Sequence, residues 1–539
     1  MTTPRVNGEA AADHGTTQSA GRSVSNPGEV ERAKRSVSKS GEAGRSWSLV
    51  LLIAYLLIRG SLGAVINAPG IGPDERGHVQ YIQTFVGRSA SETGEGGSDG
   101  GLANVTGVEA RQPVLAYLPA SALWMLTGGP ENAVSNEVAP TALAGPILAV
   151  RLLSVAWSGV TAWITWRFAL ILWPGQPGMA LLGTLLATSA PGYLFVMASI
   201  SNDPMATTTI TLALLATAQV IQGVTSAPAP GRYPLTPLAW WVASTVLAIA
   251  TKLTALPVIA GTLMAIIWAH RQHWPAWWRK RAFRAGTTLL VTTSLCGYAF
   301  LLTKHPTSSY AATAARIWPQ AILAGLNGFI TKGGLTEAFR TFWHAFDYSV
   351  RWQEPFDTIL TVIAAIPTAL ALVGLILHCI SEANPRNSRA ASTDDGVSGQ
   401  RDGAVPIPPL LWLTALCQIA FAVVRYGIGD ISGSAMGGVA QAKTFFPAIA
   451  PLGLIGAAGL ATVVTGLSRI WRRLRPVPLD QTEIQGFTGC ERSDHINLAG
   501  WGAKRGVAGL LPITFVWVSI VDVASLAVSF WRHYQWWLG

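Results

Sequence analysis

The chain has 539 residues, of which half are hydrophobic and only 12% are charged, and its mean hydropathy is +0.37. Soluble domains carry about 25% charged residues, so this composition excludes a soluble enzyme with a single membrane anchor. The net charge of +10 does not indicate a nucleic-acid partner, because the basic residues gather in a few loops and the N-terminal tail, where they set membrane topology. The composition therefore predicts a polytopic membrane protein.

The expected elements begin with a polar tail. Residues 1–45 are rich in Ser, Gly, Ala and charge, which predicts a disordered cytoplasmic tail. The apolar run 47–67 follows it and is expected to act as a signal anchor. Ten further apolar runs complete eleven expected spans of about 20 residues each. They lie near 151–173, 178–198, 204–223, 237–251, 253–270, 285–304, 357–380, 407–427, 444–466 and 506–530.

One shorter apolar run, 113–126, contains Pro113 and Pro119 and is expected to be a re-entrant or interfacial helix. With a cytoplasmic N-terminus, a non-spanning 113–126 places the basic loops 270–284 and 469–475 in the cytoplasm, as the positive-inside rule favours. We therefore predict an all-α integral membrane fold. Its parts are a transmembrane domain at 46–475 with outer loops 68–150 and 305–355, a cytoplasmic linker at 476–505, and a C-terminal transmembrane helix with a short tail at 506–539.

The same topology places several polar segments on one side of the cytoplasmic membrane, the outer side. They are 74–78, 201–203, 251–252, the loop 305–355 and 441–443. Ionisable residues this close to a bilayer are costly unless they are paired or functional. We therefore expect a functional site on the outer face.

Asp74, Glu75 and His78 form the most informative group, in the segment 72–78 (GPDERGH) just after the first apolar run. Pro73 suits the first turn of a short helix, which would place the acids at its positive end and His78 on the same face. A carboxylate here can take a proton from an acceptor hydroxyl, and the three side chains can hold a divalent metal. The alternative is a helix N-terminus whose acids only complement the helix dipole.

A second group surrounds the short apolar run. Arg111 can bind a phosphate, the aromatic Tyr117 can shape a cleft beside a proline, and Gln112 is a further substrate-binding candidate. The alternative is that the segment is an interfacial anchor. Arg151 begins a span, where it can meet a lipid phosphate or extend its charge to the headgroups.

The remaining candidates lie at later span ends. Asp203 can supply a second carboxylate or cap the next helix ahead of Pro204. Lys252 sits between two apolar runs and needs an anionic partner, either a phosphate or a carboxylate. Trp343 belongs to an aromatic stretch that suits either stacking on sugars or packing on the membrane. Lys443 opens the tenth span and either contacts a phosphate or marks the interface.

These pieces resemble the GT-C superfamily of membrane glycosyltransferases. The resemblance is carried by the Asp-Glu after the first span, the helix 112–117 (QPVLAY), the span start 151–154 (RLLS), the Asn-Asp turn and the Thr-Lys junction. Within that superfamily the chain is similar to a group of uncharacterised bacterial membrane proteins with a Pro-Asp-Glu-x-x-His loop, a Phe-Trp loop and a Gly-Arg-Tyr-x-x-Pro segment. The last motif departs here, because Lys443 replaces the arginine and Thr444 the tyrosine, and lysine lacks the bidentate fork of arginine.

The resemblance implies a glycosyltransferase that moves a sugar from a polyprenyl-phosphate donor to a glycan, lipid or protein acceptor of the cell envelope. Asp74 would be the base or a metal-linked carboxylate, with Glu75 and His78 as its support and Asp203 as a second acid. Lys252, Arg151 and Lys443 would be candidates for the lipid phosphate. Two alternatives stay open: a transporter or flippase of a lipid-linked saccharide, and a non-catalytic membrane scaffold. The need for a divalent metal is also left open.

Overall fold

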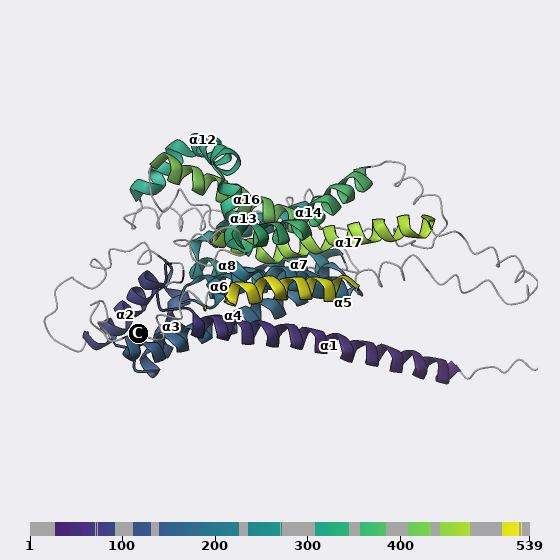
Figure 1. Cartoon of the computed structure of the whole chain (residues 1–539), viewed down its shortest axis with the longest axis horizontal. Helices are drawn as coiled ribbons and strands as arrows, with labels where there is room; N and C mark the ends of the chain where they lie inside the picture. Colours follow the sequence, from purple (N-terminus) through teal and green to yellow (C-terminus); the bar gives the residue numbers. More distant parts are fainter. Residues whose placement is uncertain are drawn as a thin grey trace, which may run out of the picture. The chain divides into compact units, whose positions relative to one another are not determined.

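The structure is a computed structural model of the whole chain, shown in Figure 1. The residues it describes are 27–70, 72, 74–91, 112–130, 140–225, 235–269, 271, 308–343, 356–383, 408–432, 442–474, 509–527 and 530. Every regular element in these ranges is a helix. The chain divides into two compact units, Met1–Ser48 and Leu49–Gly539, and all that follows on packing and the site concerns the second.

The helices before residue 200 include the first span and the elements around the candidate acids. They are α1 (Pro27–Ile66), α2 (Glu75–Ser91), η2 (Val114–Ala116), α3 (Tyr117–Leu126), α4 (Pro140–Leu172), α5 (Pro177–Thr188) and α6 (Pro191–Met197). The later elements are α7 (Asp203–Thr225), α8 (Leu235–Thr251), η3 (Leu253–Ala255), α9 (Leu256–Ala269), α12 (Ser308–Thr331), α13 (Gly334–Trp343), α14 (Phe356–Ala383), α16 (Pro409–Ser432), η4 (Ala442–Ala448) and α17 (Ile449–Leu474). A last helix covers Gly509–Ala527.

Seven of these helices are long and apolar enough to cross a membrane, and the pair α5 and α6, bent by 66°, adds an eighth if it counts as one span. Two further expected spans appear as the shorter apolar helices Thr236–Thr251 and Leu253–Ala269. The expected span 285–304 lies outside the described residues. The predicted all-helical, multi-pass membrane fold is confirmed, and the expected count of eleven spans is not reached in the part of the chain that is described.

Two regions that were expected to lie outside the spans contain helices. Residues 1–26 of the expected N-terminal tail lie outside the described residues, and α1 begins at Pro27. The outer loop expected at 305–355 contains α12 and the short α13.

The core of the second unit lies between α4, α5, α7, α9, α16 and α17. Small residues let these helices approach closely, as is usual where lipid supplies no hydrophobic drive. A Cβ on Gly374 of α14 would lie 1.9 Å from the carbonyl oxygen of Gly459 on α17, and one on Gly261 of α9 would lie 2.6 Å from the Cα of Thr414 on α16. Larger residues at these two glycines would therefore separate helix pairs.

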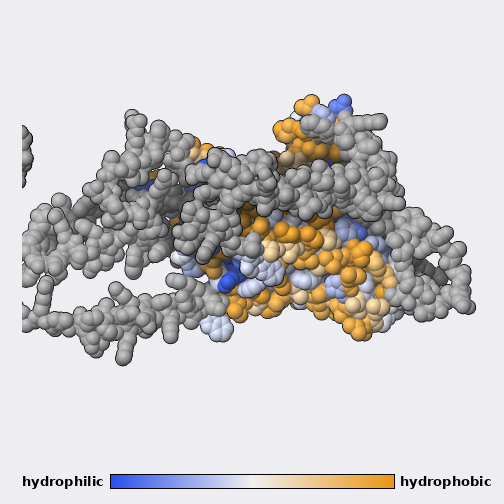
Figure 2. Space-filling model, turned by 180° about the vertical axis from the view of Figure 1, so that it is seen from behind, coloured by the Kyte–Doolittle hydropathy of each residue, from blue (hydrophilic) through white to orange (hydrophobic). Residues whose placement is uncertain are grey.

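The outward faces of the long helices are apolar. Leu62, Trp163, Ile366, Val373 and Ile520 are all exposed, and Figure 2 shows hydrophobic residues over much of the described surface. Such a surface suits lipid rather than water. At one end of α4 a separate cluster joins α2 and α3 to it (Figure 1), and its buried members include Tyr81, Tyr117, Trp124 and Val150. This cluster positions the segment that carries the candidate acids.

Candidate active site

Asp74 stands just ahead of α2 in an uncommon backbone conformation. Its φ is 61°, and among the described residues it is the one non-glycine with a positive φ. Asp is one of the residues that tolerate the left-handed region. Its carbonyl accepts the backbone N–H of His78 at 3.1 Å, and the helix begins at Glu75. The two acids therefore leave the chain in different directions, because only Glu75 has helical geometry.

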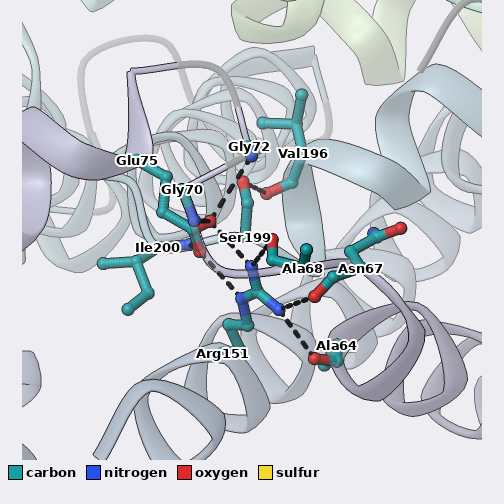
Figure 3. Close-up of polar contacts among 10 residues, drawn as sticks. All are labelled: Ala64, Asn67, Ala68, Gly70, Gly72, Glu75, Arg151, Val196, Ser199 and Ile200. Carbon is teal, nitrogen blue, oxygen red and sulfur yellow. Dashed lines mark hydrogen bonds and ion pairs between the residues drawn. The ribbon is translucent and has the colours of Figure 1, made fainter. Parts of the chain in front are cut away.

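Glu75 is held by a buried arginine (Figure 3). Arg151 donates from Nε to Oε1 of Glu75 at 2.8 Å and from Nη2 to Oε2 at 2.7 Å. The backbone N–H groups of Gly70 and Ile200 also donate to this carboxylate, at 2.9 and 3.0 Å. Burial alone would raise the pKa of Glu75, but Arg151 and these N–H donors hold it below the usual range. Glu75 is therefore an anion fixed inside the protein.

Arg151 has no donor to spare. Its remaining N–H groups donate to the carbonyls of Ala64, Asn67 and Ala68, at 2.6 to 3.0 Å. An arginine has five N–H donors, and all five are used here, while its side chain is 2% exposed. Arg151 thus fastens the segment after α1 to α4 and α2. Its guanidinium points into the protein, where its contacts are Glu75 and three backbone carbonyls.

Asp74 and Asp203 each pair with a lysine from a distant part of the chain. Lys443 of η4 donates to Oδ2 of Asp74, and Lys252 donates to Oδ1 of Asp203 at 2.5 Å. The Asp74 side chain is 47% exposed, whereas those of Lys443, Asp203 and Lys252 are 10%, 8% and 14% exposed. The two pairs lie within electrostatic range of each other. Asp74 is therefore the accessible carboxylate of a four-residue charge cluster.

The Asp74 carboxyl is a stabilised anion. Partial burial would raise the pKa of Asp74, but the Lys443 ammonium outweighs this effect and lowers the pKa below its usual range. Four elements thus contribute to one site, namely the loop before α2, the start of α7, the junction between α8 and η3, and η4. The sequence predicted that these residues share one side of the membrane, and in the structure they form two ion pairs within electrostatic range of each other.

His78 is buried beside this cluster and is neutral at ordinary pH. Its Nδ1 lies 2.6 Å from the hydroxyl of Tyr117. Burial, reinforced by the nearby Lys252, lowers the pKa of His78 to about 4. A neutral imidazole here links α2 to α3 and adds no positive charge to the site.

Gln112 lies at the same edge. Its side-chain oxygen accepts a hydrogen bond from Asn202 at 3.2 Å, and its backbone carbonyl accepts one from the Tyr81 hydroxyl at 3.3 Å. The ring of Tyr81 packs edge-on against Tyr117 at 4.6 Å. Gln112 and Tyr117 thus connect the short apolar helix to α2 and to the turn before α7.

Two expected residues do not join this group. Trp343 is 8% exposed and packs on Trp517 with ring centroids 4.8 Å apart, in an aromatic cluster with Phe342. Its side chain fills the core between helices, as loop packing would require. Arg111 lies outside the described residues.

The three side chains that the sequence offered as possible metal ligands do not converge. Asp74 faces Lys443, Glu75 faces Arg151, and His78 faces Tyr117. Across the described part of the chain, no three His, Cys, Asp or Glu side chains gather as metal ligands would. Lys443 contacts the Asp74 carboxylate, and Arg151 contacts both oxygens of Glu75.

One residue was missed at the sequence level. Arg425 lies on α16 within electrostatic range of Lys252. The signal was available, because an ionisable residue inside an apolar run marks a functional position by default. It was overlooked because Arg425 stands near the end of its run, where a charge also suits the interface.

No protein-family model matches the chain, and no curated protein matches it. Among solved structures, the chain is similar to the crystal structure of ArnT from Cupriavidus metallidurans bound to undecaprenyl phosphate. The identity is 15%, the TM-score is 0.30, and the match covers 80% of this chain and 81% of that one. The apo structure of the same protein matches at 16% identity and a TM-score of 0.29, with the same coverage.

Proposed function

We propose that the protein is a membrane glycosyltransferase of GT-C type, with its site on the outer face of the cytoplasmic membrane and its N-terminus in the cytoplasm. It would transfer a sugar from a polyprenyl-phosphate donor to a glycan, lipid or protein acceptor of the cell envelope. One observation carries the proposal. An accessible carboxylate, Asp74, and two lysines, Lys443 and Lys252, come together from distant segments at the ends of membrane helices. A lone acid that only complements a helix dipole would not need these lysines.

The chemistry follows from the charges. Asp74 accepts the proton of an acceptor hydroxyl, and the hydroxyl oxygen forms a bond to the anomeric carbon of the donor sugar. The bond between that carbon and the phosphate oxygen breaks, and its electron pair stays on the phosphate. Lys443 and Lys252 stabilise the negative charge that develops there. Donor hydrocarbon would remain in the bilayer beside the apolar helix faces, which explains why the site is built on membrane helices.

The other expected residues support this centre. Glu75 and Arg151 fix the segment that presents Asp74, because their contacts are with each other and with backbone groups. His78 and Tyr117 attach α2 to α3. Asp203 sets the position of Lys252 and supplies the second carboxylate of the site. Gln112 borders the site through Asn202.

The second candidate, a flippase of a lipid-linked saccharide, is favoured by a buried ion pair inside the membrane helices. Arg59 of α1 donates from Nε to Oδ2 of Asp522 at 2.6 Å, and Tyr55 donates to the same oxygen at 2.8 Å. Ionisable residues at this depth mark transport pathways in many membrane proteins. A flippase would move the lipid without forming a glycosidic bond.

The test is sugar transfer by the purified full-length chain in nanodiscs, with a panel of polyprenyl-phosphate sugars and with or without EDTA. Asp74→Asn should lower the transfer rate by about 10²–10⁴-fold, which is the usual contribution of a general base. Asp430→Asn is the matched control, because Asp430 pairs with the exposed Lys332 and with neither lysine of the site. Transfer that survives Asp74→Asn would remove Asp74 as the base. Movement of lipid-linked sugar across proteoliposomes without transfer would favour the flippase.

A further inference from the structure

Arg425 is a cation without a carboxylate partner among the described residues. It lies on α16, within electrostatic range of Lys252. Two turns earlier on the same helix face, Gln418 donates from Nε2 to the backbone carbonyl of Thr444 at 2.5 Å. Because Thr444 follows Lys443 directly, this face of α16 is the one that carries η4 and its lysine.

The site therefore holds more positive than negative charge. Its cations are Lys252, Lys443 and Arg425, and its anions are Asp74 and Asp203, since His78 is neutral and Glu75 is occupied by Arg151. Each lysine has three N–H donors and gives one to an aspartate. The excess charge and the remaining donors suit a further anion.

The pairing of Asp74 creates a chemical problem for the proposed reaction. A carboxylate that receives a hydrogen bond from an ammonium is a weaker base than a free one. Asp74 must nevertheless accept a proton from the acceptor. Lys443 has to leave Asp74 before that proton can move.

We infer that the carboxylates of Asp74 and Asp203 occupy an anion site in the resting protein, and that the phosphodiester of the lipid-linked sugar donor binds there by contacting Arg425 and taking Lys443 and Lys252 from them. This inference rests on the proposed function and adds a regulation to it. The incoming phosphate frees Asp74, so the base becomes active only when the donor is in place. Donor binding then precedes activation of the acceptor, and water is not activated in the empty site.

The experiment measures the affinity of dodecyl phosphate by calorimetry on the purified full-length chain in a neutral detergent. This single-chain lipid phosphate corresponds to the leaving group of the proposed reaction, and its phosphate would occupy the same anion site as that of the donor. Because Asp74 competes for Lys443, Asp74→Asn should tighten binding by about tenfold. Arg425→Met should weaken it by about tenfold, since a hydrogen bond to a charged group is lost. Asp430→Asn, which removes a charge from the same helix α16, should leave the affinity unchanged.

A double-mutant cycle separates two reasons for tighter phosphate binding. One is the transfer of Lys443 from Asp74 to the phosphate, and the other is the loss of a negative charge from the site. In a Lys443→Met background, Asp74→Asn should no longer tighten binding, because the lysine for which the two anions compete is gone. Equal tightening in both backgrounds would contradict the exchange, and so would unchanged or weaker binding by Asp74→Asn. Asp203→Asn and Lys252→Met form a second cycle with the same expectation, and thermal unfolding identifies any variant that does not fold.

The outcomes distinguish this inference from the function on which it rests. If dodecyl phosphate binds the wild type but neither Asn variant binds it more tightly, the exchange is wrong and the transferase proposal stands. If it binds neither the wild type nor the Asn variants, the exchange is wrong, and the sugar-transfer assay decides the proposed function separately. Inorganic phosphate should depend on Asp74 in the same way at lower affinity, and a response to inorganic phosphate alone would contradict the lipid as the source.

Discussion

Asp74 and Glu75 are neighbours in the chain, but their carboxylates differ in burial and in their partners. Glu75 is buried against Arg151, whose five N–H groups are all engaged. Two of them donate to Glu75 and three donate to backbone carbonyls. Asp74 is half exposed and shares a lysine that keeps donors in reserve. A saturated pair builds structure, whereas an unsaturated pair can change partners. Saturation of the donors, more than the presence of an ion pair, separates the framework from the reactive centre.

Loss of the saturated pair should have the largest effect on stability. Arg151→Met leaves the Glu75 carboxylate buried with no compensating charge, which costs about 3–5 kcal/mol. We expect a large drop in the thermal unfolding temperature in detergent, or failure to accumulate. Arg167→Met is the control, because Arg167 is an exposed arginine on the same helix α4. Equal stability of the Arg151 and Arg167 variants would contradict the framework role.

The pH dependence sharpens the comparison at His78, which lies between the two regions. The folded pKa is about 4 and the unfolded value is about 6.5, so between these values the unfolded chain binds a proton that the folded chain does not. Stability conferred by the neutral imidazole is therefore complete above about pH 6.5 and is lost as the pH falls toward 4, by up to about 3 kcal/mol. Chemical unfolding from pH 7 to 4.5 measures it. His78→Gln, which cannot ionise, should flatten this slope, and an unchanged slope would assign the effect to other groups.

The unsaturated pair should contribute least to stability. Lys443→Met removes the partner of a half-exposed carboxylate, and exposed pairs are worth about 0–1 kcal/mol. We expect the unfolding temperature to stay close to that of the wild type, measured beside Arg151→Met under the same conditions. A loss as large as that of the Arg151 variant would place Asp74 and Lys443 in the framework and remove the distinction between the two regions.

Hydropathy and spacing alone determined the architecture of this protein. The apolar runs predicted an all-helical, multi-pass membrane protein, and each span that appears as a long helix was expected at its position. Hydropathy predicts the spans because every backbone N–H and C=O group in a bilayer must be hydrogen-bonded within its own helix. Each span is therefore one continuous apolar stretch of sequence. The same pattern predicted that Asp74, Asp203, Lys252 and Lys443 lie on one side of the membrane. This prediction reduced the number of candidate site residues.

Only the tertiary structure decided what each charge does. Lys443 and Asp74 are 369 positions apart, and Arg151 and Glu75 are 76 apart, so no local spacing encodes these pairs. The sequence offered Arg151 as a candidate for a lipid phosphate or the headgroup region, and in the structure its guanidinium is buried against Glu75. It grouped Asp74, Glu75 and His78 as one trio, and in the structure the three side chains contact three different partners. Charge placement at span ends is a local property of the chain, whereas the partner of each charge depends on how the helices pack.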